Sequence, residues 1–264
     1  MTYVFTTLDY SGATGTAALG VDGHGDIVGY FVDSSGTQHG YEDNNGNLIT
    51  IDFGPIVDTI AYNGVSKSGI IVGDYYLGGN EFAFSSNLFS ITTYLSSASE
   101  VLNANGINDK GWVVGDFFDG TTNHGLLITP TTLPKVLDDP SAGSIGTFAK
   151  GINNNGQIVG GYFDSSGAEH GFVYYNGKWT TLDDPLGYNT ECEGINNKGQ
   201  IVGIYFENGI EHGFVASKVN GKFVFTEVAD PLGVKGTGAF GINNHGEIVG
   251  IYYDVAGVEH GFHT

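Results

Sequence analysis

Five histidines recur at the same point of a repeated pattern, each directly before a glycine: His39, His124, His170, His212 and His260. Imidazole groups bind metals and exchange protons near neutral pH, so a ring of them could form a metal or acid–base array. Each histidine, however, belongs to a separate copy of the pattern, and one copy has none. We therefore favour a structural role, in which each imidazole bonds the backbone or a neighbouring turn.

An acidic residue lies shortly before each histidine and opens a turn rich in serine or glycine. These residues are Asp33, Asp119, Asp164 and Asp254, with Glu207 as the stand-in. Such turns could hold calcium, with Glu169, Glu211 and Glu259 close to them across the hairpin. The spacing matches neither the EF-hand nor the nonapeptide calcium pattern, and an aspartate commonly opens a turn by accepting backbone N–H groups. We predict that these aspartates form turns, and we assign no cofactor, with calcium as an open alternative.

A second set of polar residues varies from copy to copy. The first and third positions before the start glycine of each copy share one side of a strand, because side chains alternate along it. Residue types that vary at these positions indicate a side of the strand that packs against no common neighbour. Near a central axis, such a side faces a channel. The predicted ligand-binding residues of this channel, together with one aromatic residue from a crossing loop of the same face, are Asn63, Asn103, Asn105, Lys150, Glu191, Glu193 and Tyr188.

These residues would offer a ligand a carboxylate pair, amides and an aromatic ring, which is how many sugar sites are built. A water-filled pore with drifting polar residues is the simpler alternative. We predict no catalytic residue, because the chain contains no nucleophile elbow, phosphate loop, zinc spacing or cofactor fingerprint.

The elements that must position these residues follow from a repeat, whose clearest copy, GINNNGQIVGGYFDSSGAEHGF, runs from Gly151 to Phe172. Successive copies lie 44, 42, 45, 43 and 47 residues apart, and they begin at Gly20, Gly64, Gly106, Gly151, Gly194 and Gly241. This period is typical of propeller blades built from four short strands.

One copy predicts four antiparallel strands. Residues 147–153 form the inner strand, 157–164 the second, 170–175 the third and 178–182 the outer strand, with glycine-containing turns between them. We therefore predict an all-β fold, a six-bladed β-propeller of four-stranded antiparallel blades. It forms a single domain of residues 1–264, with blades that start near residues 14, 58, 101, 145, 188 and 235.

The last copy is cut short, and its missing part lies at the other end of the chain. Residues 5–16 align without gaps on residues 179–190 of the fourth copy. We therefore predict that residues 1–10 complete the last blade, with Val4 to Leu8 beside Gly261 to His263. A closed ring uses this arrangement to remove an exposed sheet edge.

The pattern GINxxGxIVGxY, followed by a short turn and HGF, resembles the bacterial HAF repeat, whose family consists of extracellular repeat proteins. The resemblance covers nearly the whole chain. The second copy departs most, with Phe82 in the place of the histidine and Leu77, Gly78 and Gly79 in the turn. The resemblance implies a secreted or surface-exposed propeller, and it implies no particular reaction.

The formal net charge of −20 results from a shortage of bases. The chain has 29 Asp and Glu residues against nine Lys, and it has no Arg. Nucleic acids and anionic membrane surfaces require cationic partners, so we expect the chain to bind neither. Sialidase-like propellers and fucose-binding propeller lectins hold their ligands with arginine, so neither chemistry can be transferred to this chain.

The single cysteine, Cys192, excludes an intramolecular disulfide. Alanine occupies its place in other copies, so we predict a packed small residue rather than a reactive thiol. Met1 leads directly into an expected strand without a signal peptide. A removed leader, a C-terminal export route and a cytoplasmic location stay open, but the composition and the HAF resemblance favour an extracellular or cell-surface location.

The expected function is a non-catalytic secreted or surface binding module. Its channel or a loop face would bind an extracellular glycan, peptide or protein, and we expect a monomer. The alternative is a calcium-assisted hydrolase or lyase that uses the channel carboxylates. A purely structural role in a surface array is the third interpretation.

Overall fold

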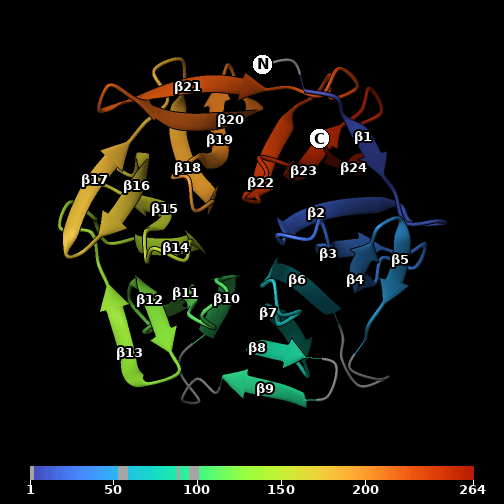
Figure 1. Ribbon diagram of the computed structural model, residues 1–264, viewed down its shortest axis with the longest axis horizontal. Helices are drawn as coiled ribbons and strands as arrows, with labels where there is room; N and C mark the ends of the chain where they lie inside the picture. The colour runs from blue at the N-terminus through green and yellow to red at the C-terminus, as the bar shows by residue number, and fades with distance from the viewer. Residues whose placement is uncertain (1–2, 53–58, 88–89, 95–100) are drawn as a thin grey trace.

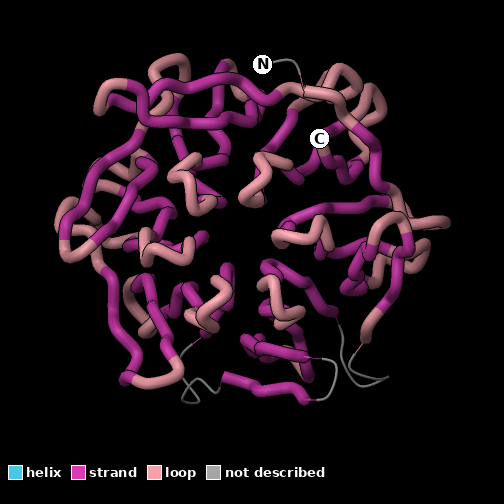
Figure 2. The backbone as a smooth tube through the Cα atoms, viewed as in Figure 1, coloured by secondary structure: helices cyan, strands magenta, loops and turns pink. Residues whose placement is uncertain are grey.

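The computed structural model describes residues 3–52, 59–87, 90–94 and 101–264. These residues form strands and turns without a helix, as Figure 2 shows. The described part therefore contains no helix that is long and apolar enough to cross a membrane.

The strands fall into groups of four along the chain, which we call units one to six (Figure 1). Unit one comprises β2 (Gly15–Val21), β3 (Ile27–Val32), β4 (Gln38–Asn44) and β5 (Asn47–Thr50). Unit two comprises β6 (Thr59–Val65), β7 (Ile71–Leu77), β8 (Asn80–Asn87) and β9 (Ser90–Tyr94). Unit three comprises β10 (Val101–Ile107), β11 (Val113–Phe118), β12 (Asn123–Thr129) and β13 (Thr132–Leu137).

The remaining units continue the same order. Unit four comprises β14 (Gly146–Ile152), β15 (Ile158–Phe163), β16 (Glu169–Tyr175) and β17 (Lys178–Leu182). Unit five comprises β18 (Tyr188–Ile195), β19 (Ile201–Glu207), β20 (Ile210–Val219) and β21 (Lys222–Val228). Unit six comprises β22 (Thr237–Ile242), β23 (Ile248–Tyr253), β24 (Glu259–His263) and, from the start of the chain, β1 (Thr6–Leu8).

The units are arranged radially around a centre in a propeller-like fold, with the first strand of each unit innermost (Figure 1). Neighbouring strands within a unit pair antiparallel, and a single parallel bridge between Asn123 and Gly146 joins units three and four into one eight-stranded sheet. The expected all-β class is therefore confirmed. The blade start expected near residue 58 lies outside the described residues.

The two ends of the chain meet in one sheet. Thr6, Thr7 and Leu8 of β1 pair with His263, Phe262 and Gly261 of β24. The pairing expected from the sequence alignment is confirmed. Because β1 covers the outer edge of β24, the C-terminal strand is not left as an unpaired edge.

Adjacent units pack through apolar side chains of their inner strands and second strands. Between units three and four, for example, Val114 contacts a buried cluster that includes Ala149, Tyr162 and Phe172. Cys192 takes the same kind of place in unit five; it is fully buried, and burial raises the pKa of its thiol. It is a packed small residue, as predicted.

Asparagines of the first turn connect the units close to the axis. The Asn153 amide donates to the backbone carbonyl of Asn196 at 3.0 Å, and the Asn196 amide donates to that of Asn243 at 3.0 Å. The backbone N–H of Asn154 donates to Oδ1 of Asn197 at 2.8 Å. The two adjacent asparagines of the repeat are thus links between neighbouring units.

Candidate functional site

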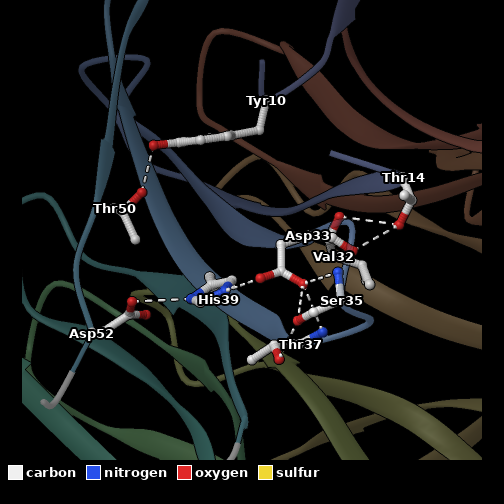
Figure 3. Close-up of polar contacts among 9 residues, drawn as sticks. All are labelled: Tyr10, Thr14, Val32, Asp33, Ser35, Thr37, His39, Thr50 and Asp52. Atoms are coloured by element: carbon white, nitrogen blue, oxygen red, sulfur yellow. Dashed lines mark hydrogen bonds and ion pairs between the residues drawn. The ribbon is translucent and has the colours of Figure 1, made fainter. Parts of the chain in front are cut away.

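Four of the recurring histidines, His39, His124, His170 and His260, lie between two acidic side chains, and His212 contacts one, Glu227. Figure 3 shows this for unit one, where His39 Nε2 is 3.3 Å from Asp33 Oδ2 and His39 Nδ1 is 3.0 Å from Asp52 Oδ2. Asp33 lies in the turn between β3 and β4, and Asp52 follows β5, so the imidazole joins two parts of the unit. It also stacks on Phe31, with ring centroids 5.0 Å apart.

The other units repeat this arrangement. The shortest contacts between imidazole and carboxylate are His124 to Asp138 at 2.9 Å, His170 to Asp183 at 3.0 Å, His212 to Glu227 at 3.0 Å and His260 to Asp9 at 3.0 Å. Each imidazole stacks on the aromatic residue of the second strand. In unit two, Phe82 stacks on Tyr75 instead, at 5.2 Å. The histidines are therefore structural clamps, and their partners are carboxylates rather than the backbone.

The carboxylates raise the pKa of three of these imidazoles, those of His39, His124 and His170. Burial alone would lower the pKa of His170, but hydrogen bonds to Asp183 and Asp164 and the charges of both raise it above its ordinary value. The same balance raises the pKa of His39 and of His124.

The turn aspartates are used by their own turns. Asp164 Oδ1 accepts from Ser166 N at 2.7 Å, Ser166 Oγ at 2.7 Å and Ala168 N at 3.0 Å, which holds the pKa of Asp164 at about 2. The glutamates considered as calcium partners face elsewhere: Glu259 accepts from Tyr30 Oη at 3.0 Å and from Tyr253 Oη at 2.9 Å. Asp164 is therefore occupied by its own turn, and Glu259 by two tyrosine hydroxyl groups.

The inner strands of all six units surround a narrow central channel. Each has an irregularity directly before its start glycine, where one residue is left without a partner on the second strand. A bulge of this kind turns the extra side chain away from the regular ladder. The residues that line a cavity of about 80 Å³ in this way are Leu19, Asn63, Asn105, Lys150, Glu193 and Phe240.

The channel asparagines bind two buried aspartates. Asn103 Nδ2 and Asn105 Nδ2 donate to the two oxygens of Asp116 at 2.9 and 2.8 Å. Asn63 Nδ2 donates to Asp74 at 2.6 Å, and burial raises the pKa of Asp74 to about 8 despite this bond. The first and third positions before the start glycine therefore share one side of β10.

Lys150, Glu191 and Glu193 form a charged group in the same channel. Lys150 Nζ lies 3.2 Å from Glu191 Oε1. Burial alone would lower the pKa of Lys150, but Glu191, Glu193 and Asp116 raise it above its ordinary value. Burial, and then the charge of Glu191, raises the pKa of Glu193 well above its ordinary value. The channel thus places a carboxyl group of raised pKa beside an ion pair.

Two further glutamates extend this acidic group. Burial and the charge of Glu191 raise the pKa of Glu169 to about 7. Burial, followed by the charges of Glu259 and Glu191, raises the pKa of Glu211. Oε1 of Glu211 and Oδ1 of Asn103 are buried without a hydrogen-bond partner among the described residues.

The structure thus brings six of the seven predicted residues together and leaves one apart. Asn63, Asn105, Lys150 and Glu193 line the cavity, while Asn103 and Glu191 bind to groups in its wall. Tyr188 begins β18 outside the cavity, is 54% exposed and packs against Phe206.

Sequence reasoning missed Asp74 and Asp116. Both directly follow the Val-Gly pair that recurs in every second strand. Both also pair with the residue three positions before the start glycine, so that Asp116 faces Asn103. The residue after Val-Gly changes from unit to unit, being Tyr30, Asp74, Asp116, Gly161, Ile204 and Ile251. This variation could have indicated that the residue after Val-Gly faces the channel.

A larger pocket, which the sequence did not reveal, lies where the start of the chain crosses the outer part of units five and six. Its cavity measures about 460 Å³, within the range of small-molecule sites. Figure 1 places this N-terminal segment between β21 and β24. The lining residues are Tyr3, Phe5, Thr7, Glu227, Ala229, Asp230, Pro231 and Leu232.

The pocket combines aromatic surface with hydrogen-bonding oxygens. Tyr3 and Phe5 lie edge to face with ring centroids 6.2 Å apart, and Phe5 is anchored on Phe262 at 5.2 Å. Glu227 and Asp230 add carboxylates, and the lining contains no cation. Tyr3, Phe5 and Thr7 come from the start of the chain, whereas the other lining residues belong to the end of β21 or follow it.

The fold resembles that of solved propellers. The lectin of Aleuria aurantia, described as a six-bladed β-propeller with a novel fucose recognition mode, superposes with a TM-score of 0.60 at 10% identity, covering 98% of this chain and 93% of the lectin. A gluconolactonase from Xanthomonas campestris has a TM-score of 0.55 at 10% identity, covering 94% of this chain and 86% of the enzyme. The virginiamycin B lyase of Staphylococcus aureus has a TM-score of 0.53 at 15% identity, covering 99% of both chains.

Sequence comparison adds nothing to this: no family model matches the chain, and no curated protein matches it. At 10 to 15% identity the solved structures show the propeller-like fold alone.

Proposed function

We propose that the protein is a non-catalytic carbohydrate-binding module whose glycan site is the pocket beside β1. The observation that carries this proposal is the pocket itself, with Tyr3 and Phe5 as an aromatic wall and Glu227, Asp230 and Thr7 as hydrogen-bonding groups. Aromatic faces pack on the apolar side of a sugar ring, while carboxylate oxygens accept from its hydroxyl groups.

The charge of the chain selects among glycans. Glu227 and Asp230 would repel an anionic sugar, and the lining offers no cation to neutralise one. The preferred ligand is therefore a neutral glycan rather than a sialylated or uronic one. The similarity to a fucose-binding propeller supports a glycan partner in kind, although an arginine-dependent mode is closed to a chain without arginine.

The proposal includes the finer architecture and the location. We propose a closed six-bladed ring of HAF repeats in one domain, secreted or held at the cell surface and monomeric. The pairing of β1 with β24 supports closure, and the regular GINxxGxIVGxY pattern supports the repeat assignment.

A glycan array with the purified protein tests the function. We expect binding to neutral glycans and at least tenfold weaker binding by Tyr3→Ala, equivalent to about 1.4 kcal/mol. Tyr188→Ala is the matched control, because it removes an exposed tyrosine far from the pocket, and it should bind as the unmodified protein does. The proposal is contradicted if the protein binds no glycan on the array, or if Tyr3→Ala binds as strongly as the unmodified protein.

The channel supports a second candidate, a hydrolase or lyase. Burial and the charge of Glu191 raise the pKa of Glu193, and Glu191 is paired with Lys150. A carboxyl group of raised pKa beside a second carboxyl group is a common acid–base arrangement. Turnover of a glycan that is lost in Glu191→Gln and Glu193→Gln, but kept in Tyr3→Ala, would favour this candidate over the binding module.

A further inference from the structure

The first turn of unit one differs from its counterparts in charge. In units four and five, the first asparagine of the turn donates twice through its amide nitrogen. Asn153 Nδ2 donates to Gln157 Oε1 at 2.8 Å and to the carbonyl of Asn196 at 3.0 Å. In unit six, Asn243 Nδ2 donates to Glu247 at 2.8 Å. The amide nitrogen thus lies between two oxygen atoms.

Unit one has carboxylates in both of these places, Asp22 for the asparagine and Asp26 for the fifth residue of the turn. The Asp22 side chain is only 1% exposed. Its Oδ1 accepts from the backbone N–H groups of His24 and Asp26 at 2.7 and 3.0 Å, as in the other turns. Its Oδ2 therefore stands in the place of the amide nitrogen, where a donor is replaced by an acceptor.

Because a carboxylate replaces the amide, Asp22 and Asp26 bring two groups of like charge together at this turn. Carboxylate oxygens of Asp22 and Asp26 lie within 4.8 Å of each other. Burial, and then the charges of Asp26 and Asp22, raises the pKa of Glu42 on the neighbouring strand. The stem of Lys67 passes close to Gly23, yet among the described residues no ion pair joins Lys67 to either aspartate. The partner of Asp22 among the described side chains is instead the His24 imidazole, which compensates these charges only when it is protonated.

His24 completes a set of metal-ligating atoms. Its Nδ1 lies 3.2 Å from Asp22 Oδ2, and one ligand atom from each of Asp22, His24 and Asp26 falls within 4.8 Å of the others. His24 itself is 56% exposed, which leaves the set open to solvent. It is the one such group of three among the described residues.

We propose that Asp22, His24 and Asp26 bind a divalent transition-metal cation, Zn²⁺ in the first instance. Two carboxylate oxygens and one imidazole nitrogen suit zinc, with water at the remaining position, better than they suit calcium, which prefers oxygen ligands alone. The cation supplies the positive charge that the amide N–H groups supply in the other units, so it stabilises the first turn of unit one. It lies in the channel mouth, since Asp22 lines the same small cavity as Asn108, Asn153, Asn196 and Asn243.

Zinc titration of the metal-free full chain by calorimetry, with metal content after dialysis, tests this site. We expect one Zn²⁺ per chain and a higher Tm with zinc, because an ion that binds only the folded state stabilises it. Asp22→Asn introduces the residue that units three to six have at this position. The variant should fold at least as well, bind zinc at least tenfold more weakly and lose the rise in Tm.

His245→Lys is the matched control, because His245 occupies the position of His24 in a turn that begins with Asn243. It should keep both zinc binding and the rise in Tm. Absence of zinc uptake by the unmodified chain, or unchanged uptake by Asp22→Asn, overturns the proposal. A stronger response to Ca²⁺ than to Zn²⁺ overturns the choice of metal.

Discussion

At the scale of single residues, the glycine after valine in each second strand is required by a close approach of two backbones. A Cβ added to Gly160 would lie 2.0 Å from the carbonyl oxygen of Phe148 and 3.0 Å from the Phe172 ring. The distance from the added Cβ to the nearest backbone carbonyl oxygen is 1.8 to 2.0 Å at all six of these glycines, Gly29, Gly73, Gly115, Gly160, Gly203 and Gly250. A backbone oxygen cannot yield as a flexible side chain can, so this position accepts only glycine.

Gly160→Ala should therefore lower the free energy of unfolding by about 2–3 kcal/mol, the usual cost of overpacking a well-packed core. Urea denaturation followed by tryptophan fluorescence measures this loss. Gly15→Ala is the control, because the nearest atom to its added Cβ is Glu259 Cβ at 3.7 Å, an ordinary contact. Equal stability of the two variants would contradict the close-approach argument.

At the scale of elements, each histidine clamp connects the second hairpin of a unit to the exit of its outer strand. His170 bridges Asp164, in the turn before β16, and Asp183, directly after β17. Its folded pKa is raised, so its stabilisation is fully present below the unfolded value of about 6.5 and is lost as pH rises through the higher folded value.

His170→Phe copies unit two, where Phe82 keeps the aromatic stacking without a charge. The variant should fold. Between pH 5.5 and 8.5 its Tm should fall by about 2 °C less than the Tm of the parent, since a partly exposed ion pair contributes little. Thermal unfolding at both pH values checks this. An identical pH dependence in variant and parent would show that the clamp acts by packing alone.

At the scale of the whole molecule, units two to five bring acidic groups to the central channel or its wall. Burial raises the pKa of Asp74 to about 8 and that of Glu169 to about 7. Both groups bind a proton more tightly in the folded state than in the unfolded state. Stability therefore falls as pH rises from about 4 toward 8. The turn aspartates act oppositely: the pKa of Asp164 is held at about 2, so its contribution is lost only in strong acid.

We therefore expect the highest Tm near pH 5 and a Tm several degrees lower at pH 8.5. Differential scanning calorimetry across this range measures the slope. Glu169→Gln and Asp74→Asn should each flatten it, because neither amide titrates. Glu207→Gln, which removes an exposed carboxylate outside the channel, should leave the slope nearly unchanged. A Tm that rises steadily from pH 5 to 8.5 would contradict the predicted ionisation of the channel.

The sequence by itself determined the repeat, the all-β class, the four strands of a unit and the pairing of the chain ends. It could do so because these features depend on local patterns: alternation along a strand, glycine and asparagine at the turns, and an alignment between residues 5–16 and 179–190. Strand alternation also placed Asn103 and Asn105 on one side of their strand, where both bind Asp116.

Only the tertiary structure decided which of these groups face one another. Asp116 meets Asn103 across two strands, Glu193 meets Lys150 across two units, and the pocket around Tyr3 and Phe5 forms where the first residues of the chain meet units five and six. Such contacts depend on the register of paired strands and on the angle between units. Hydrophobic periodicity within one segment carries no information on either, because it describes a strand without its neighbours.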